Sequence, residues 1–296
     1  MKLEKASKQY SLNYEASVNY FSELVLFDAG FYKKNKQKQT LLIGLDEVGR
    51  GCIAGPVAAA AYSCSDFYAG AKDLLRFVKF GEELLDEQLY SLLLLDDSKR
   101  VPHTKREQLC AALLDLPSMQ DETHIFHSIS FEPACNVDEK GIVECIWDAM
   151  VTSLLDVLHQ YQSFYNKTPK EILLLVDGNK TISNLVSRLN ACDANVQDFK
   201  FLEMDFDPQQ ARLELELNQK QAITIKQVSV IRGDSQSASI AAASNLAKNA
   251  RDKYMETICQ SKYSWATNSG YGTREHYKAI EKHGLSDQHR KSFMSS

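Results

Sequence analysis

The chain has 296 residues, 44% of them hydrophobic and 25% charged, and a formal net charge of −5 at pH 7. These values are typical of a globular protein with one large domain, and the negative net charge excludes a general electrostatic attraction to nucleic acid. Seven cysteines without a CxxC pair, no signal peptide and no long apolar span predict a reduced, cytoplasmic protein with no membrane partner.

Charge is distributed unevenly along the chain. Residues 248–296 hold nine Lys or Arg against five Asp or Glu, whereas residues 192–220 hold three basic against seven acidic residues. A basic C-terminal segment beside an acidic site suits a polyanion that is held over metal ions.

The first predicted elements lead to an acidic strand end. Residues 1–38 are predicted to form an N-terminal helical extension, with Tyr20, Leu24 and Phe27 at helical spacing. Strands are predicted at about 40–45 and 57–63, because short apolar runs bounded by Gly and Pro are typical of buried strands. Asp46 and Glu47 stand at the end of the first strand, where open sheets usually place their ligands.

A short glycine-rich segment follows these two acids. Gly49 and Gly51 allow a ligand to approach the backbone closely, and Arg50 between them is placed to meet a phosphate. A solvated turn whose charges have no function is the alternative interpretation of this segment.

The middle of the chain predicts further helices and one strand. Residues 66–95 are predicted to be helical, and Ser98 beyond them can cap a helix that starts near Pro102, whereas Lys99 can reach a phosphate. A third strand is predicted at 124–131. A long helix is predicted at 137–165, with Ile142, Ile146, Met150, Leu154 and Leu158 along its buried face.

Two more apolar runs end in an acid. The run 172–176 leads into Asp177, and the run 228–231 leads into Asp234, which precedes a helix rich in Ala and Ser. Those small residues predict very close packing of the helix on the sheet. Between the two runs, residues 191–222 form an acidic insertion, which is predicted to be a β-hairpin because apolar residues alternate at 213–217 and again at 223 and 225.

Four acids therefore stand at predicted strand ends. Carboxylates held close together raise one another's pKa values unless cations neutralise them. Oxygen ligands select hard divalent ions such as Mg²⁺, and two ions about 3.5–4 Å apart can stabilise the attacking and leaving oxygens of a phosphodiester displacement.

Five sequence blocks identify a family resemblance. They are DEVGRGCIAGPVAAAAY, DSKRV, VDGN, RGDSQSASIAAASNLAKNARDKYM and GYGTREHYKAIEKHG with HRKSF, and in this order they resemble bacterial ribonuclease HII. The resemblance implies an α/β ribonuclease H-like fold over 39–296: a mixed sheet flanked by helices, with a C-terminal helical portion (about 250–296) that helps to hold the hybrid. It also implies an endonuclease that cuts RNA–DNA hybrids and cuts 5′ of single ribonucleotides in duplex DNA, leaving 3′-hydroxyl and 5′-phosphate ends.

The resemblance also assigns roles to residues. Those that it identifies as catalytic residues and ligands of two Mg²⁺ or Mn²⁺ ions are Asp46, Glu47, Asp177 and Asp234. Those that it assigns to substrate binding are Gly49, Arg50, Gly51, Ser98, Lys99, Tyr271 and Arg290. Within this set, the Gly49–Gly51 loop is expected to read ribose 2′-hydroxyls, Lys99 to contact a phosphate and Tyr271 to sense the RNA–DNA junction. Arg251 and Asp252 are expected to be structural, and the protein is expected to be a monomer.

Some features depart from the family pattern and leave alternatives open. The gaps from Asp46 to Asp97 and from Asp177 to Asp234 are wider than usual, and an Arg stands before Gly233 where Lys is common, which puts substrate preference in doubt. The alternatives are a ribonuclease HIII-like hybrid nuclease, a hybrid-binding protein without catalysis, or an assembly protein that docks a partner through its acidic hairpin. Arg50 between the glycines argues against the first, and the presence of all four acids argues against the second.

Overall fold

The structure is a computed structural model that describes residues 14–34, 40–64, 91–115, 124–192, 200–204, 222–258 and 261–294. In this part of the chain the strands form one six-stranded sheet in the order β3-β2-β1-β4-β6-β5. The strands are β1 (Thr40–Val48), β2 (Val57–Cys64), β3 (Ile125–Glu132), β4 (Glu171–Asp177), β5 (Lys200–Met204) and β6 (Ala222–Val230). β1, β2 and β3 pair antiparallel, whereas β1, β4, β6 and β5 pair in parallel, so the sheet is mixed, as predicted.

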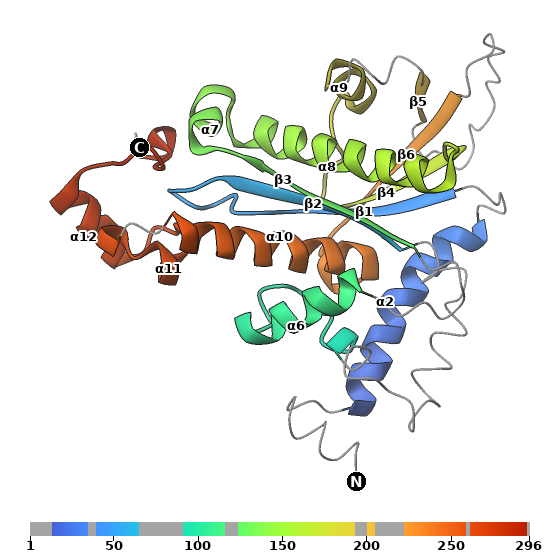
Figure 1. The fold of residues 1–296 in the computed structure, drawn as a ribbon, viewed down its shortest axis with the longest axis horizontal. Coiled ribbons are helices and arrows are strands. Elements are labelled where there is room, and N and C mark those ends of the chain that lie inside the picture. Colours follow the sequence, from blue (N-terminus) through green and yellow to red (C-terminus); the bar gives the residue numbers. More distant parts are fainter. Residues whose placement is uncertain are drawn as a thin grey trace.

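Helices cover both faces of the sheet (Figure 1). They are α2 (Tyr14–Lys34), α6 (His103–Leu114), α7 (Ala134–Lys140), α8 (Ile142–Tyr165), α9 (Leu185–Cys192), α10 (Ala238–Thr257), α11 (Trp265–Asn268) and α12 (Arg274–His283). α8 lies on one face with α7 and α9, and α10 lies on the other with α6 and α2 (Figure 1). None of the helices in these ranges is long and apolar enough to cross a membrane.

Strand β1 is buried on both sides, which explains its continuous apolar run. Leu42 packs in the core under α10, whereas Ile43 and Leu45 pack in the core under α8. At Gly44 the helix α10 comes so close that a Cβ atom would lie 2.3 Å from the backbone carbon of Ser239. The close packing predicted from the small residues of α10 is therefore confirmed.

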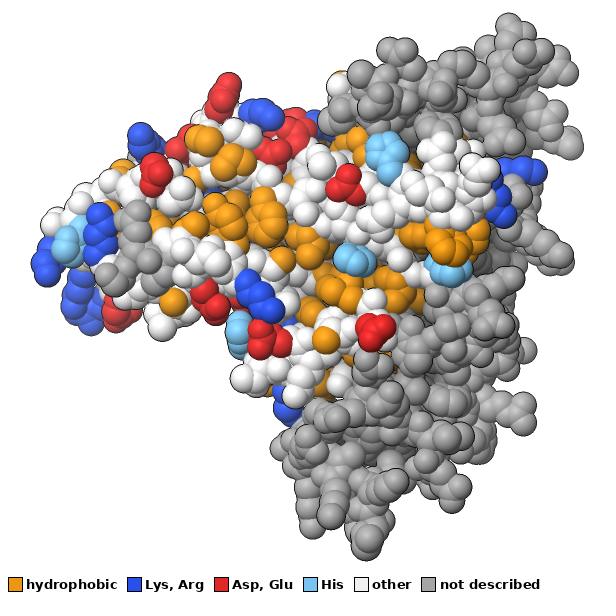
Figure 2. All heavy atoms as spheres, viewed as in Figure 1, with side chains coloured by type: hydrophobic (Ala, Val, Ile, Leu, Met, Phe, Trp, Pro, Cys, Tyr) orange, Lys and Arg blue, Asp and Glu red, His pale blue; other side chains and the backbone are white. Residues whose placement is uncertain are grey.

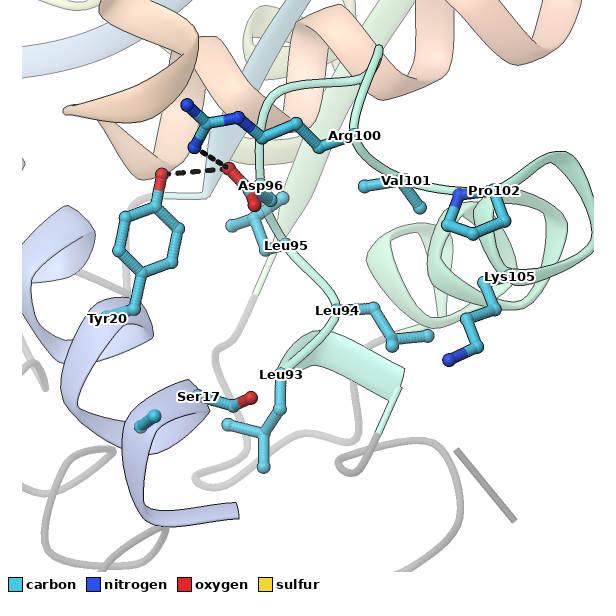
Figure 3. A pocket seen from close by; sticks show the side chains of 11 residues that line it. Ser17, Tyr20, Leu93, Leu94, Leu95, Asp96, Arg100, Val101, Pro102 and Lys105 are labelled. Atoms are coloured by element: carbon cyan, nitrogen blue, oxygen red, sulfur yellow. Dashed lines mark hydrogen bonds and ion pairs between the residues drawn. The ribbon is translucent and has the colours of Figure 1, made fainter. Parts of the chain in front are cut away.

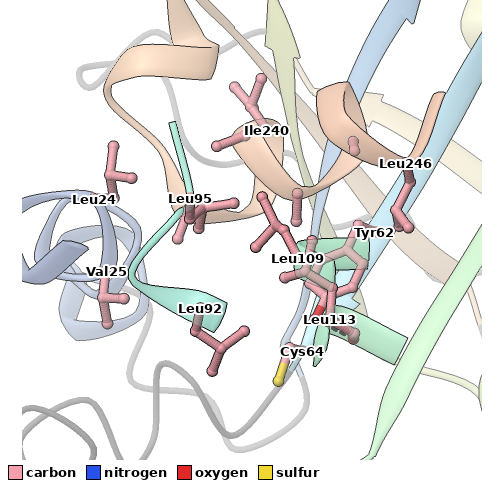
Figure 4. Packing of buried hydrophobic residues seen from close by; sticks show 14 of the residues in the cluster. Leu24, Val25, Tyr62, Cys64, Leu92, Leu95, Leu109, Leu113, Ile240 and Leu246 are labelled. Carbon is pink, nitrogen blue, oxygen red and sulfur yellow. Dashed lines mark hydrogen bonds between the residues drawn. The ribbon is translucent and has the colours of Figure 1, made fainter. Parts of the chain in front are cut away.

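The N-terminal helix is part of the core. Leu24 and Val25 of α2 are buried, and Figure 4 shows them beside Leu92, Leu95 and Ile240, which come from the segment before α6 and from α10. The prediction of a helix in this region is confirmed for Tyr14–Lys34, and residues 1–13 and 35–39 lie outside the described ranges.

Two predicted elements differ from the structure. The helix predicted at 137–165 is divided into α7 and α8 at Gly141, whose φ of +86° is a conformation that favours glycine and ends the first helix. The predicted hairpin is wrong for Ile223 and Ile225, because both belong to β6, an interior strand that pairs in parallel with β4 and β5. Residues 205–221, with the rest of the predicted hairpin, and residues 65–90, with most of the helix predicted at 66–95, lie outside the described ranges.

Candidate active site

The carboxyl ends of three neighbouring parallel strands bring the four predicted acids to one end of the sheet. Leu45 of β1 pairs with Val176 of β4, so Asp46 and Asp177 are the next residues at the same level. Asp177 in turn pairs with Val230, the last residue of β6. Asp234 follows in a short 3-10 turn, Gly233–Ser235, that leads into α10. The acids thus lie at the carboxyl ends of parallel strands, which is where open sheets usually bind their ligands.

The carboxylates at this edge disfavour one another's charge. Asp46 is only 5% exposed, and burial, followed by the charges of Glu47 and Asp177, raises its pKa well above the usual carboxyl value. Burial also raises the pKa of Glu47, against the opposing effect of the Arg50 guanidinium. Mutual repulsion of buried carboxylates is the situation that a bound cation relieves.

A fifth acid, which the sequence did not single out, lies beside Asp234. Burial, followed by the charges of Asp97 and Asp177, raises the pKa of Asp234 to about 6, while Lys99 acts in the opposite direction. The signal for Asp97 was its place after the apolar run 92–95, which matches the run-then-acid pattern of the other sites.

Hydrogen bonds fix the orientation of two of the carboxylates. The backbone amide of Glu47 donates to Asp46 Oδ1 at 2.7 Å, and the amide of Gly233 donates to Asp177 Oδ1 at 2.6 Å. Among the described residues, no three His, Cys, Asp or Glu side chains already converge on one metal-binding point. The donor chemistry nevertheless fits hard divalent cations, because the groups at these strand ends are carboxylate oxygens, and the pKa values of Asp46, Glu47 and Asp234 are raised.

The Gly49–Gly51 loop is supported from behind by a buried arginine. Gly49 has a φ of +86°, and a Cβ atom there would lie 2.2 Å from Nε of Arg251. Arg251 is fully buried and donates to the carbonyls of Pro56 at 2.8 Å, Ser269 at 2.8 Å and Ala54 at 3.1 Å. This agrees with the structural role predicted for Arg251.

Arg290 is placed differently from the prediction that it contacts substrate. Its side chain is fully buried, with the guanidinium donating to the carbonyls of Gly49 at 2.7 Å, Gly55 at 3.0 Å and Arg50 at 3.2 Å. The sequence could not show this, because these contacts join residues about 240 positions apart. Arg290 therefore holds the loop in place and does not itself face the substrate side.

The outer side of the loop is available for a ligand. The Arg50 side chain is 64% exposed and lies 3.6 Å from Glu47, while a Cβ atom at Gly51 would meet no atom within 4 Å. Arg290 binds the carbonyls of Gly49 and Arg50, whereas the described part of the chain contains no hydrogen bond from the backbone amides of Arg50 and Gly51. These amides are donors placed for a polar ligand.

Ser98 is not a helix cap. The residue before α6 is Pro102, without a side-chain cap, and the Ser98 hydroxyl oxygen instead lies 2.9 Å from that of Ser244 on α10. The Ser244 hydroxyl also lowers the pKa of Asp46, so a chain of polar groups connects Ser98 with the acids. Lys99 beside it is exposed and close enough to Asp234 to affect its pKa.

Tyr271 lies on a second loop that is joined to the first. The amide of Ile53 donates to the Gly270 carbonyl at 2.9 Å, and Arg251 holds the carbonyl of Ser269. The Tyr271 side chain is 41% exposed, with the Lys248 ammonium 6.0 Å from its ring centroid. It is therefore open to a ligand and not buried among the C-terminal helices.

Two buried histidines fix the backbone at Tyr271. Nδ1 of His276 lies 2.9 Å from the Tyr271 carbonyl, an acceptor, so Nδ1 carries the proton. His276 Nε2 then accepts from Trp265 Nε1 at 3.0 Å and from His289 Nε2 at 3.1 Å, and His289 Nδ1 accepts from the Ser286 amide at 2.9 Å. Every contact is satisfied only when both rings are neutral, and burial lowers both pKa values.

Basic side chains gather beyond these loops. Figure 2 shows Lys and Arg at the end of the molecule that Figure 1 assigns to α12. Arg274, Lys278 and Lys282 of α12 are exposed there. The C-terminal part of the chain therefore presents basic side chains to solvent, as its excess of Lys and Arg predicted.

The family model and the curated relatives name one family. A family model described as Ribonuclease HII matches residues 179–296. A ribonuclease HII of Flavobacterium psychrophilum is 33% identical over 86% of this chain and 91% of its own length. A ribonuclease HII of Rickettsia canadensis is 30% identical over 90% of this chain and 95% of its own length. A solved ribonuclease HII in a complex with PCNA from Archaeoglobus fulgidus aligns with a TM-score of 0.48 at 19% identity, covering 84% of this chain and 93% of that one.

Proposed function

The chain belongs to the ribonuclease HII family, whose members are endonucleases that act on RNA paired with DNA, and we propose that its four strand-end carboxylates carry this activity. The proposed substrates are RNA–DNA hybrids and duplex DNA with single ribonucleotides, cut on the 5′ side of the ribonucleotide to leave 3′-hydroxyl and 5′-phosphate ends. Its proposed roles are the removal of ribonucleotides and of RNA primers from DNA. The observation that carries the assignment is the meeting of Asp46, Glu47, Asp177 and Asp234 at the edge of β1, β4 and β6.

The proposed metal ligands are these four acids. Two Mg²⁺ or Mn²⁺ ions, when bound, would neutralise the carboxylates and stabilise the attacking and leaving oxygens of the phosphodiester. The amides of Glu47 and Gly233 orient the side chains of Asp46 and Asp177, so these carboxylates are set in place before a ligand arrives. Asp97 lies close enough to Asp234 to support the same site.

Recognition of RNA is assigned to the two joined loops. The 2′-hydroxyl is the group that distinguishes ribose from deoxyribose, and it can both donate and accept a hydrogen bond. The amides of Arg50 and Gly51 can donate to it, because Arg290 holds the carbonyls of Gly49 and Arg50 on the buried side of the loop. The exposed ring of Tyr271 can pack on a sugar, and Arg50 and Lys99 can contact phosphates.

The basic residues of α12 support nucleic acid as the partner, and the free cysteines support a reducing compartment. Exposed Lys and Arg of α12 provide a path for the phosphate backbone away from the acids. The cysteines of the described part, Cys52, Cys64, Cys110, Cys135 and Cys145, are free thiols, which suits the proposed cytoplasmic location. We propose that the protein acts on its duplex as a monomer.

The test uses three duplexes of one sequence: all DNA, DNA with a single ribonucleotide, and an RNA–DNA hybrid. With Mg²⁺ the protein should cut the second at the 5′ side of the ribonucleotide and the third at several places, and it should leave the first intact. A chelator should abolish both activities. Cleavage of the hybrid alone would favour a ribonuclease HIII-like activity, and binding of either substrate without cleavage would contradict the proposed function.

A further inference from the structure

The N-terminal helix α2 has no part in the mechanism above, yet it reaches the turn that carries Asp234. The Tyr20 hydroxyl donates to Asp96 Oδ1 at 3.0 Å and lies 3.3 Å from the carbonyl oxygen of Ser235. Figure 3 shows the ring of Tyr20 rising from α2 towards Asp96, with the Arg100 guanidinium next to the same carboxylate oxygen. One phenol thus touches two loops that come from distant parts of the chain.

Both of these loops border Asp234. Ser235 is the residue after Asp234 in the turn Gly233–Ser235, and its carbonyl is the atom near Tyr20. Asp96 precedes Asp97, whose charge raises the pKa of Asp234, and the amide of Asp97 donates to Asp96 Oδ1 at 2.7 Å. Tyr20 therefore contacts Ser235, next to Asp234 in the chain, and Asp96, next to the Asp97 whose charge acts on Asp234.

A second contact of α2 fixes the helix that follows the same turn. The buried carboxylate of Asp28 accepts a hydrogen bond from the Ser239 amide at 2.8 Å, in the first turn of α10. Because Asp28 is fully buried and a carboxylate at a helix N-terminus is favourable, this contact sets the position of α10 relative to α2. The turn with Asp234 is thus held by Tyr20 at Ser235, and the helix that follows is held by Asp28 at Ser239.

The Asp96 carboxylate that Tyr20 contacts is itself held in place by other side chains. Asp96 also receives Arg100 at 3.5 Å, and the Asp96 carbonyl accepts from Asn245 of α10 at 2.8 Å. Burial and the Asp96 charge raise the pKa of Tyr20, so its hydroxyl keeps its proton and stays a donor across the working pH range. Asp96 is therefore held by three side chains, of which α2 contributes the Tyr20 phenol.

We propose that Tyr20 is a positioning residue for the active site: by holding Asp96 and the Ser235 carbonyl, it sets the position of Asp234 and so the affinity of the site for a divalent cation. The inference rests on the proposed role of Asp234 as a metal ligand. It assigns to the N-terminal helix a part in the reaction, although no residue of α2 lies at the strand ends.

The test is Tyr20→Phe, which keeps the ring and its packing and removes the hydroxyl. The matched control is Tyr62→Phe, because the buried Tyr62 hydroxyl likewise donates to a backbone carbonyl, that of Leu113 at 3.0 Å, and touches none of the acids. Mn²⁺ affinity is measured by titration calorimetry without substrate. Cleavage of a duplex with one ribonucleotide gives kcat, KM and the Mg²⁺ concentration for half-maximal rate, and thermal unfolding gives Tm.

Tyr20→Phe should weaken Mn²⁺ binding three- to tenfold, raise the half-maximal Mg²⁺ concentration to the same extent and lower kcat, with KM for the duplex unchanged. Tyr62→Phe should lower Tm at least as much and leave metal affinity and kcat at the parent values. Parental Mn²⁺ affinity in Tyr20→Phe, or equal losses in both variants, would overturn the inference.

Asp234→Asn, measured in the same way, separates this inference from the proposed function. If Asp234→Asn loses Mn²⁺ affinity while Tyr20→Phe keeps it, only the role of Tyr20 is overturned. If Asp234→Asn itself binds Mn²⁺ and cleaves as the parent does, the metal site proposed for the family activity is wrong, and the inference about Tyr20 is overturned with it.

Discussion

The two glycines of the recognition loop should respond oppositely to the same substitution. At Gly49, alanine must adopt a φ of +86°, and its Cβ atom would lie 2.2 Å from Nε of Arg251. The left-handed conformation costs about 1–2 kcal/mol, and displacement of a buried arginine with three hydrogen bonds adds a similar amount. Gly49→Ala should therefore lose about 2–4 kcal/mol of stability.

Gly51→Ala should leave the fold intact and impair recognition. Gly51 is exposed, and its Cβ atom would meet nothing within 4 Å, so the change in stability should be within about 0.5 kcal/mol. The new methyl group would stand on the outer side of the loop, where the Arg50 and Gly51 amides are proposed to donate to the ribose. We expect a loss of about tenfold or more in kcat/KM for a single-ribonucleotide duplex, corresponding to about 1.4 kcal/mol.

The assay combines urea unfolding of both variants with cleavage at saturating Mg²⁺. The pair serves as its own control, because the substitution is the same and the positions are two residues apart. Parental cleavage by a fully folded Gly51→Ala would refute the reasoning that this side of the loop contacts the ribose. Parental stability of Gly49→Ala would refute the account of Arg251 as a rigid support.

Three further predictions concern groups that support the loops. Arg290→Met should remove three hydrogen bonds to loop carbonyls, two of them buried, and cost about 3 kcal/mol or more in urea unfolding. Arg188→Met, which breaks partly exposed ion pairs with Glu144 and Asp148 remote from the loops, should cost less, about 1 kcal/mol, and equal losses would contradict the support role of Arg290. Burial holds the pKa of His289 at about 4, below the ordinary 6.5, with His276 and Lys262 acting in the same direction and Asp287 opposing them. Between these two pH values His289 binds a proton in the unfolded chain but not in the folded one, so the free energy of unfolding should fall by up to about 3 kcal/mol as the pH drops from about 6.5 to about 4. His289→Gln should make the free energy of unfolding depend less on pH in this range. An unchanged pH dependence would contradict the assignment of His289 as a buried neutral ring. Tyr271→Ala should reduce kcat/KM more for a single ribonucleotide than for a long hybrid, with Tyr271→Phe between, and equal losses on the two substrates would show a general structural role.

Much of the site was predictable because each strand end is a local pattern. A buried apolar run followed by an acid appears at Asp46, Asp177 and Asp234, and parallel pairing of the three strands is enough to bring these acids together. The role of Gly49 and Gly51 in letting a ligand approach the backbone could also be predicted, because the turn and its two flanking strands lie within one short segment of sequence.

The supports of the site were not predictable, because they are contacts between distant residues. From the sequence, Arg290 is predicted to contact the substrate. Only its burial and its hydrogen bond to the Gly49 carbonyl show that it supports the loop. The sequence predicts Ser98 as a helix cap, but its hydroxyl contacts Ser244. The sequence predicts Tyr20 as part of the apolar face of a helix, but its hydroxyl donates to Asp96. In each case the deciding partner is set by tertiary packing and not by local propensity.

The most direct test of the account is the binding of Mn²⁺ to the protein without substrate, measured by calorimetry for the parent and for Asp177→Asn. Asp177 stands between the strands that carry Asp46 and Asp234, so the loss of its charge should weaken Mn²⁺ binding at least tenfold and abolish most cleavage. The fold should be retained, since an asparagine oxygen can still accept the bond from the Gly233 amide. Unchanged Mn²⁺ affinity and cleavage in a folded Asp177→Asn would contradict the assignment of the strand-end acids as the metal site.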